Sequence, residues 1–347
     1  MPAMEEFGKR IARYLAHRMP EACDVEVQEI QRIHGGASRE TYRLRASYTA
    51  DGAEQVRGLI LRRDPPGSLI DTDRANEFNA YLAFHKSEVP VPEPLWLEED
   101  PAWLDRPFFV MEEISGCEAS PQVLLMPPYA EHLERIGEQK WRILGAISRS
   151  DPEAVGLAEA MEHVSPDLAW KRELDYWEGV IDEDEISPQP IARAAIRWLR
   201  RNPPPPAQKL GVVHGDFRTG NLLVDPEGQI RAVLDWEMAH LGDPLEDLAW
   251  SINRIWCWAR DDRVGGLLPR ERAIAIWEEA SGLVADPEAL HWWELFSGVK
   301  GLGIWVSSGR EYLDGPNRDP VLAFTAWWLP NSQDRAILET LGRLEPA

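Results

Sequence analysis

The amino-acid sequence predicts an α+β fold with two lobes, a small lobe of antiparallel strands in the first third and a larger, mainly helical lobe whose pattern begins at about Gln122. Two patterns predict this division. The first third contains short apolar or alternating runs broken by turn residues, whereas the rest contains long stretches with helical spacing. With 347 residues, of which 44% are apolar, the chain can fill a core in each lobe on either side of a shared cleft.

Short alternating runs in the first third are typical of consecutive antiparallel strands, and they cover residues 25–33, 41–47 and 57–63. Beyond a turn-forming segment at 64–67, apolar side chains recur at helical spacing. We therefore expect a helix over residues 72–86 that packs on the sheet. Two more strands, each marked by nearby prolines, are expected near Leu95 and over residues 108–111.

Helical patterns dominate the second lobe, and the clearest of them cover residues 129–150 and 191–201. Three strand-like runs lie among the helices, over residues 210–213, 221–224 and 229–234. A turn at 225–228 joins the last two runs. Nine of the 16 tryptophans lie from Trp250 onward, and such density favours a helical core over a ligand cage.

The composition argues against several classes of function. With 59 acidic and 37 basic side chains, the net charge of -22 repels phosphate backbones and anionic lipid, so we expect neither a nucleic-acid nor a membrane partner. The three cysteines are far apart, which fits a reducing compartment and gives no disulfide or metal-ligand spacing. No apolar stretch reaches the roughly 20 residues of a membrane span, and the acidic N-terminus does not resemble a signal peptide. We expect a cytoplasmic protein of unknown oligomeric state.

Three polar residues interrupt the apolar strands of the second lobe at defined intervals: Asp216, Asn221 and Asp235. They lie in VVHGDFRTGNLLVDPEGQIRAVLDW, residues 212–236. Each residue type is common in turns when taken singly. Phosphoryl transfer, however, needs a carboxylate that accepts a hydroxyl proton and oxygen ligands that hold Mg²⁺ against the phosphates. A His-x-Asp-x4-Asn loop, followed after a hairpin by another Asp, supplies these groups in the order that kinases use.

This segment resembles the signature of the aminoglycoside phosphotransferase and choline kinase-like family, whose fold is protein kinase-like. The resemblance covers most of the chain. It implies that Asp216 is the catalytic base, that Asn221 and Asp235 bind magnesium, and that His214 supports the catalytic loop. In the following GDPLEDLAW, Asp247 matches a position that braces this loop. The resemblance also implies ATP or GTP with Mg²⁺ as cofactors and a small-molecule hydroxyl as acceptor.

A kinase of this kind needs a cationic strand residue with an acidic partner on a helix. The alternation of the third strand places Ile60 and Arg62 on one face and Leu61 with Arg63 on the other. Arg62 is therefore expected to meet the phosphates, with Glu77 as its partner. Kinases usually have lysine here, and the planar fork of arginine binds phosphate with a different geometry. An arginine followed by Pro-Pro-Gly resembles the branch of the family that is sometimes fused to acyl-CoA dehydrogenase domains.

Two further nucleotide contacts are expected from the first lobe. Gly35 and Gly36 lie between two strands, where glycine lets the backbone approach phosphate oxygens, and Ser38 adds a hydroxyl. The segment that begins at residue 108 resembles the strand and hinge that join the lobes in this family, which implies an antiparallel-sheet lobe over residues 1–112 and a mainly helical lobe over residues 113–347. The backbone of Glu112 and Ile114 is expected to hydrogen-bond the adenine.

Other functions stay open from the sequence. The chief alternative is a nucleotide-binding pseudokinase with a regulatory role, in which Arg62 marks lost turnover. A protein kinase fits less well, because Gly215 follows His214 and no activation segment is evident. Glycoside hydrolysis by paired carboxylates leaves Asn221 unexplained. The acceptor is open among an aminoglycoside, another amino alcohol, a sugar and a hydroxyacyl thioester, with resemblance favouring a hydroxyacyl or other metabolic hydroxyl.

Overall fold

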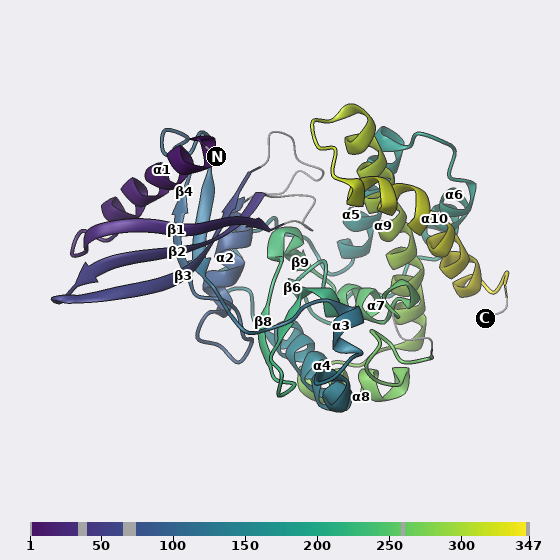
Figure 1. Cartoon of the computed structure of the whole chain (residues 1–347). Coiled ribbons are helices and arrows are strands. Elements are labelled where there is room, and N and C mark those ends of the chain that lie inside the picture. The colour runs from purple at the N-terminus through teal and green to yellow at the C-terminus, as the bar shows by residue number, and fades with distance from the viewer. Residues whose placement is uncertain (1, 34–39, 65–73, 258–260, 345–347) are drawn as a thin grey trace.

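The computed structural model describes residues 2–33, 40–64, 74–257 and 261–344. Figure 1 shows two lobes, with the strands of the first at the left and the helices of the second at the right. The first lobe is an antiparallel sheet in the order β1-β2-β3-β5-β4, formed by β1 (Cys23–Ile33), β2 (Glu40–Ala50), β3 (Ala53–Arg63), β4 (Pro94–Glu98) and β5 (Phe108–Glu112). The strands predicted in this part of the sequence are confirmed.

A helix covers each face of the sheet. On one face, α1 (Pro2–Arg18) buries Ile11 and Tyr14 in a small core together with Leu61 of β3. On the other face, α2 (Arg74–Phe84) buries Tyr81 and Phe84 in a larger core that continues into the second lobe. Helix α1 was missed from the sequence. Helix α2 was predicted correctly, but the prediction continued two residues beyond its C-terminal end, and residues 72 and 73 lie outside the described residues.

The two faces of β3 carry different arginines, as the alternation predicted. Ile60 packs against the large core on the α2 side, and Arg62 lies on that side as well. Arg63 lies on the opposite face, where its Nη2 is 2.6 Å from Glu40 and its guanidinium stands over the ring of Phe7 in α1. Arg63 therefore stabilises the sheet lobe itself, whereas Arg62 is directed toward the second lobe.

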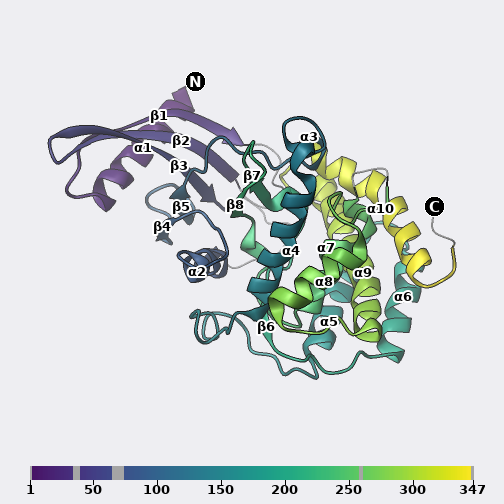
Figure 2. The same ribbon diagram turned by 90° about the horizontal axis from the view of Figure 1, so that it is seen from below.

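The second lobe is mainly helical, as predicted. Its helices are α3 (Pro121–Leu124), α4 (Leu133–Arg149), α5 (Ala169–Asp184), α6 (Pro190–Arg201), α7 (Leu245–Ile252), α8 (Arg270–Ser281), α9 (Pro287–Asp314) and α10 (Pro320–Thr340). Helix α9 is largely buried and packs against α5, α6, α7 and α10, while α8 packs against α4 (Figure 2). None of the helices that the structure describes combines the length and the apolarity needed to cross a membrane.

Most of the late tryptophans fill the helical core, which confirms the interpretation of their density. The fully buried ones are Trp250, Trp277, Trp292 and Trp293. Trp327 and Trp328 of α10 lie outside this core, with exposed fractions of 54% and 65%, which agrees with the amphipathic edges expected of such a core.

Two short antiparallel strand pairs lie inside the helical lobe, and they position the loop residues of the motif. One joins β6 (Gly211–Val213) to β9 (His240–Gly242), and the other joins β7 (Leu222–Val224) to β8 (Ile230–Val233). The predicted turn at 225–228 connects β7 and β8. The loops that follow β6 and β8 lie close together, because Nε2 of His214 is 3.0 Å from the carbonyl oxygen of Leu234.

The small core of the sheet lobe makes a first prediction. Leu61 is fully buried in β3, so Leu61→Ala removes buried methyl groups and leaves a cavity. We expect the free energy of unfolding to fall by about 2–5 kcal/mol in chemical denaturation. The matched control is Val56→Ala in the same strand, where the side chain is 61% exposed and the expected change is within about 0.5 kcal/mol. Equal losses for the two variants would contradict the packing of α1 on this face.

Candidate functional site

A sharp turn follows β6 and orients the loop of the motif. At Gly215 the backbone φ is +83°, a conformation that glycine adopts without strain. The turn also leaves no space for a side chain, because a Cβ atom on Gly215 would lie 2.4 Å from the carbonyl oxygen of Met238. Glycine is thus required at this position for two independent reasons, and the turn fixes the direction of Asp216.

The carboxylate of Asp216 is held by three side chains. Its Oδ1 accepts a hydrogen bond of 2.8 Å from the indole nitrogen of Trp250 in α7, and its Oδ2 accepts one of 2.7 Å from Nδ2 of Asn221. The Nε atom of Arg218 lies 3.1 and 3.2 Å from the two oxygens. The side chain of Asp216 is still 15% exposed. The carboxylate of Asp216 is therefore held in one orientation, while part of it remains accessible to a ligand.

Asn221 connects Asp216 to the second carboxylate. Its Nδ2 donates to both the carbonyl and the Oδ2 of Asp216, which fixes the amide with its Oδ1 turned away from that residue. The backbone carbonyl of Asn221 accepts a hydrogen bond of 2.8 Å from the N–H of Leu234. Since Asp235 follows Leu234, the amide oxygen and the second carboxylate lie on neighbouring, mutually bonded segments.

Asp235 has a left-handed backbone, with φ 70° and ψ 54°, which is uncommon for a residue other than glycine and concentrates at functional sites. Its N–H donates to the hydroxyl of Tyr81 in α2 at 2.9 Å. Its Oδ1 lies 2.8 Å from Nη2 of Arg62. Burial alone would raise the pKa of this carboxyl, but the attraction to Arg62 outweighs it and the pKa of Asp235 is lowered.

Arg62 links the two lobes because it pairs with one carboxylate from each of them. Its Nη1 lies 2.8 Å from Oε1 of Glu77, which is fully buried in α2, and its Nη2 reaches Asp235 of the second lobe. Burial opposes the charge of Arg62, but Glu77 and then Asp235 raise its pKa well above the ordinary value. The predicted contact of Arg62 with Glu77 is present, and it is a buried pair rather than a pair on an exposed helix surface.

His214 is neutral and joins the segments of the two aspartates. Its Nε2 lies 3.0 Å from the carbonyl of Leu234, and its Nδ1 lies 3.1 Å from the N–H of Asp216. Only the neutral form protonated on Nε2 satisfies both contacts. Burial lowers the pKa of His214 to about 4, in agreement with this tautomer.

Asp247 of α7 accepts hydrogen bonds from the loop backbone. Its Oδ2 is 2.6 Å from the N–H of His214 and its Oδ1 is 3.0 Å from the N–H of Gly215. Burial, reinforced by the charge of Glu246, raises the pKa of Asp247 to about 6. The geometry is the one expected of a residue that braces the loop.

The remaining nucleotide contacts are placed only in part. Three of the expected residues lie outside the residues that the structure describes: Gly35, Gly36 and Ser38. Glu112 ends β5, and its N–H donates to the carbonyl of Glu93 at 3.0 Å. An adenine contact at Glu112 would therefore use its carbonyl oxygen, with Ile114 two residues beyond the strand.

Three residues of the site were not named from the sequence. Arg218 lies inside the motif, where its charge was a usable signal. Trp250 ends the GDPLEDLAW segment, but nothing in the sequence indicates that its indole reaches Asp216. Lys300 of α9 donates a hydrogen bond of 2.6 Å to the carbonyl of Gly215 from 85 positions away, and no local pattern marks it.

The donor set suits a magnesium ion that shares its ligands with a nucleotide. The amide oxygen of Asn221 and the carboxylate of Asp235 are hard oxygen ligands of the kind that Mg²⁺ prefers. Mg²⁺ is commonly held by one or two such protein groups together with phosphate oxygens and water. Because Arg62 already pairs with Asp235, this site has fewer free ligands than an all-protein metal cage would need.

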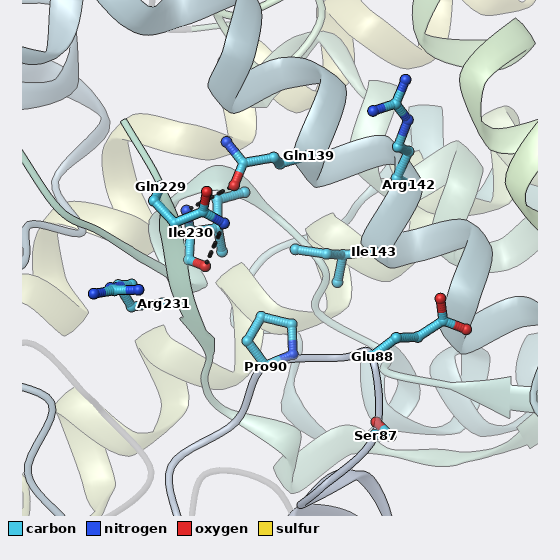
Figure 3. A pocket seen from close by; sticks show the side chains of 9 residues that line it. All are labelled: Ser87, Glu88, Pro90, Gln139, Arg142, Ile143, Gln229, Ile230 and Arg231. Atoms are coloured by element: carbon cyan, nitrogen blue, oxygen red, sulfur yellow. Dashed lines mark hydrogen bonds between the residues drawn. The ribbon is translucent and has the colours of Figure 1, made fainter. Parts of the chain in front are cut away.

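A cavity of about 380 Å³ lies apart from this site, between α4, β8 and the segment after α2 (Figure 3). Gln139 of α4 is fixed on its wall, because its Oε1 accepts a hydrogen bond of 3.1 Å from the N–H of Ile230. The cavity is lined by Ser87, Glu88, Pro90, Gln139, Arg142, Ile143, Gln229, Ile230 and Arg231. None of the residues that surround Asp216 or Asp235 lines it.

The turn at Gly215 gives a second prediction. Gly215→Ala meets both a positive φ and the Met238 carbonyl, so we expect it to lower the free energy of unfolding by about 3 kcal/mol or more. Gly156→Ala is the matched control, because Gly156 has a φ of +76° with open space around it, and about 1–2 kcal/mol is expected. Indistinguishable melting curves for the two variants would show that the loop does not pack as described.

The chain is similar to known proteins along most of its length. A model described as the phosphotransferase enzyme family matches residues 29–306. Acyl-CoA dehydrogenase family member 10 of Mus musculus is 32% identical over 230 residues, which cover 64% of this chain and 20% of that protein. Acyl-CoA dehydrogenase family member 11 of Homo sapiens is 27% identical over 337 residues, which cover 88% of this chain and 41% of that protein. The chain thus spans from about a fifth to two fifths of these relatives.

Solved structures show the same fold. A putative aminoglycoside phosphotransferase from Ralstonia eutropha superposes with a TM-score of 0.73 at 20% identity, with 97% of this chain and 99% of that chain covered. An aminoglycoside phosphotransferase in a ternary complex with ADP and hygromycin B superposes with a TM-score of 0.59 at 18% identity, covering 95% and 98%. With its protein kinase-like fold and a family match over more than half of its length, the chain belongs to the phosphotransferase enzyme family.

Proposed function

We propose that the chain is a small-molecule kinase that transfers the γ-phosphate of a nucleoside triphosphate to a hydroxyl group, with Asp216 as the base. One observation carries the proposal. Asp216 is an oriented and partly exposed carboxylate that accepts a hydrogen bond from the side-chain amide of Asn221, and the backbone carbonyl of Asn221 is bonded to Leu234, the residue before Asp235. This is the group of oxygen ligands and base that phosphoryl transfer requires.

The proposed reaction proceeds by direct displacement. The hydroxyl oxygen of the acceptor attacks the γ-phosphorus while its proton passes to Oδ1 or Oδ2 of Asp216. The bond between the γ-phosphorus and the β–γ bridging oxygen breaks, and the nucleoside diphosphate leaves with that electron pair. Arg218, 3.1 Å from Asp216, supplies positive charge where the negative charge of the transferring group would otherwise repel the carboxylate.

Asn221 and Asp235 are the proposed ligands of magnesium. When bound there, Mg²⁺ would neutralise the phosphates and polarise the γ-phosphoryl group. Oδ1 of Asn221 is oriented for this role because Nδ2 is engaged by Asp216. Arg62 lowers the pKa of Asp235, which keeps this carboxyl in the ionised form that a metal ligand needs.

The sheet lobe is proposed to bind the nucleotide. Arg62 would contact the phosphates while Glu77 holds its other guanidinium nitrogen, and the carbonyl of Glu112 with the backbone of Ile114 would meet the adenine. Gly35, Gly36 and Ser38 are proposed to cover the phosphates. The lobes of residues 1–112 and 113–347 would then close on ATP, or on GTP, from both sides.

The identity of the acceptor follows only from analogy. A neighbour of this fold was solved with the aminoglycoside hygromycin B, whereas the curated relatives carry the name of acyl-CoA dehydrogenases. An aminoglycoside, another amino alcohol, a sugar and a hydroxyacyl thioester are therefore all candidate acceptors. The relatives favour a hydroxyacyl or other metabolic hydroxyl.

A regulatory pseudokinase is the alternative, and one observation favours it. Arg62 stands where kinases usually have lysine and pairs with Asp235, a proposed magnesium ligand. A permanent pair of this kind would compete with metal binding. The two proposals differ in whether a bound nucleotide is turned over.

The third prediction tests turnover. Incubation of the chain with Mg-ATP and a panel of the four acceptor classes should release ADP with at least one class. Asp216→Asn should lower kcat by about 100-fold or more, since a general base is lost. Asp105→Asn is the control, because Asp105 is an exposed carboxylate of the sheet lobe paired with Arg10. ADP release at the background rate with every acceptor would favour the pseudokinase.

The fourth prediction concerns Arg62. Arg62→Ala removes the proposed phosphate contact, so the KM for Mg-ATP should rise by about tenfold or more, and Arg62→Lys should restore part of the loss. Arg45→Ala, which removes an exposed arginine of β2, should leave the KM unchanged. Circular dichroism must first show that the Arg62 variants fold, since Glu77 is buried. Equal KM values for Arg62→Ala and Arg45→Ala would contradict the assignment.

A further inference from the structure

A chain of buried charges lies behind the loop that carries Asp216. Nζ of Lys300 in α9 is 2.8 Å from Oε1 of Glu246 in α7, and both side chains are 1% exposed. Oε2 of Glu246 is 3.1 Å from Nε2 of His240 in β9. The same Nε2 is 3.5 Å from Oε1 of Glu173 in α5, whose carboxylate also pairs with Arg172 at 2.8 Å. Four elements of the second lobe thus meet at one set of charges.

Lys300 contacts the loop directly. Besides Glu246, its Nζ donates a hydrogen bond of 2.6 Å to the carbonyl of Gly215. The same ammonium group lies 5.2 Å from the ring centre of Trp250, whose indole nitrogen donates to Asp216. Lys300 therefore touches both the backbone that precedes Asp216 and the side chain that orients it.

His240 contacts the loop by a second route. Its Nδ1 lies 2.9 Å from the carbonyl oxygen of Met238. That oxygen packs so closely on Gly215 that a Cβ atom there would lie 2.4 Å away. In addition, β9 pairs with β6 so that His240 faces Val213, directly before the loop. The ring of His240 thus fixes the backbone on which Gly215 turns.

The contacts of His240 require the charged form of its ring. Nδ1 faces a carbonyl oxygen and Nε2 faces two carboxylates, so both nitrogens must carry a proton to donate to these acceptors. Burial by itself lowers the pKa of His240, but Glu173 and Glu246 outweigh it and raise the pKa to about 9. The carboxyl of Glu246 is likewise held ionised, because Lys300 and His240 overcome its burial and lower its pKa to about 2.

We propose that Lys300, Glu246 and His240 are positioning residues of the phosphotransfer reaction, and that the charged ring of His240 is needed to keep the Asp216 loop aligned. This inference rests on the proposed function and adds three side chains from outside residues 212–236. The three side chains act through the backbone of Gly215 and through Trp250, not on the substrate. Their loss should lower kcat far more than it changes the KM for ATP.

A divalent metal does not explain the cluster. The carboxylates of Glu173 and Glu246 and the ring of His240 could approach one ion, since their ligand atoms lie within 4.8 Å of one another. Glu246 is already paired with Lys300, and Glu173 with Arg172. A doubly charged ion would stand beside two cations, whereas a proton on Nε2 balances the charges and completes the hydrogen bonds.

The surroundings of His240 define its pH dependence. The charged groups that face it come from α5 (Arg172 and Glu173), from α7 (Glu246, with Asp247 beside it) and from α9 (Lys300), and Asp243 lies in the segment between β9 and α7. The pKa of Asp243 is raised to about 6 by burial, and that of Asp247 also to about 6. Because these two carboxyls titrate near pH 6, a change of charge near pH 9 is assigned to His240 and not to them.

The sign of the effect follows from the raised pKa. The charge of His240 stabilises the folded chain fully below its ordinary pKa of 6.5, and this stabilisation is lost as the pH rises through about 9. The alignment of the loop should be lost over the same range. The natural chain should therefore show a fall of kcat on the alkaline side, near pH 9.

The test compares His240→Gln with His163→Gln, a change at an exposed histidine outside the cluster. Glutamine keeps a donor and the approximate size of the ring but does not titrate. We expect His240→Gln to remove the fall of kcat near pH 9, to lower kcat at pH 7.5 by about tenfold to 100-fold, and to change the KM for Mg-ATP by less than about threefold. His163→Gln should keep the natural profile.

Lys300 is tested by Lys300→Met alone and together with Glu246→Gln. The single variant leaves a buried carboxylate without its main partner and is at risk of misfolding. The double variant removes both charges and should fold, as judged by its thermal midpoint. We expect its kcat to be lower by about 100-fold with little change in the KM for ATP. Full activity of a folded double variant would overturn the proposal.

A readout without turnover separates this inference from the proposed function. The indole N–H signal of Trp250, assigned by its absence in Trp250→Phe, reports the hydrogen bond to Asp216 in a ¹H–¹⁵N spectrum. This signal should shift with a midpoint near pH 9 in the natural chain and not in His240→Gln.

If the Trp250 signal shifts in this way in a chain that transfers no phosphate, the proposed function fails and the positioning network stands. A signal that is independent of pH in the natural chain would overturn the network. So would Zn²⁺ that raises the thermal midpoint of the natural chain but not of His240→Gln.

Discussion

The site depends on how a buried segment of backbone, residues 214–216, is held in one conformation. This segment lies inside the helical lobe, where every polar backbone group needs a partner. Asp247 accepts from two of its N–H groups, and Lys300 donates to the carbonyl of Gly215. Charged side chains thus replace the hydrogen bonds that a regular strand or helix would provide. These hydrogen bonds fix the backbone on which Asp216 is carried, and with it the direction of the Asp216 side chain.

The same constraint explains why the second lobe is rich in buried charge. Lys300 and Glu246 are nearly inaccessible, and such a pair is costly unless its partners are well placed. Here α7 supplies neighbouring carboxylates with separate tasks, because Asp247 binds the loop N–H groups while Glu246 holds Lys300 and His240. Between the two lobes, Arg62 has a comparable role because it joins Glu77 of the sheet lobe to Asp235.

Much of this arrangement could be predicted from the sequence, because local patterns encode it. The alternation of β3 assigned Arg62 and Arg63 to opposite faces, and the spacing of Asp216, Asn221 and Asp235 marked the centre of the site. Helix α1 was missed although Ile11 and Tyr14 have helical spacing. Lys300 could not have been found, because its contact with Gly215 spans 85 residues and depends on how α9 packs.

The central claim is that Asp216 serves as base beside a magnesium nucleotide held by Asn221 and Asp235. A crystal structure with Mg²⁺ and a non-hydrolysable ATP analogue tests it most directly. The account predicts a metal ion bound by Oδ1 of Asn221 and by Asp235, with Asp216 still bonded to Trp250 and free of metal. A nucleotide bound elsewhere, or a metal on Asp216 while Arg62 still pairs with Asp235, would contradict it.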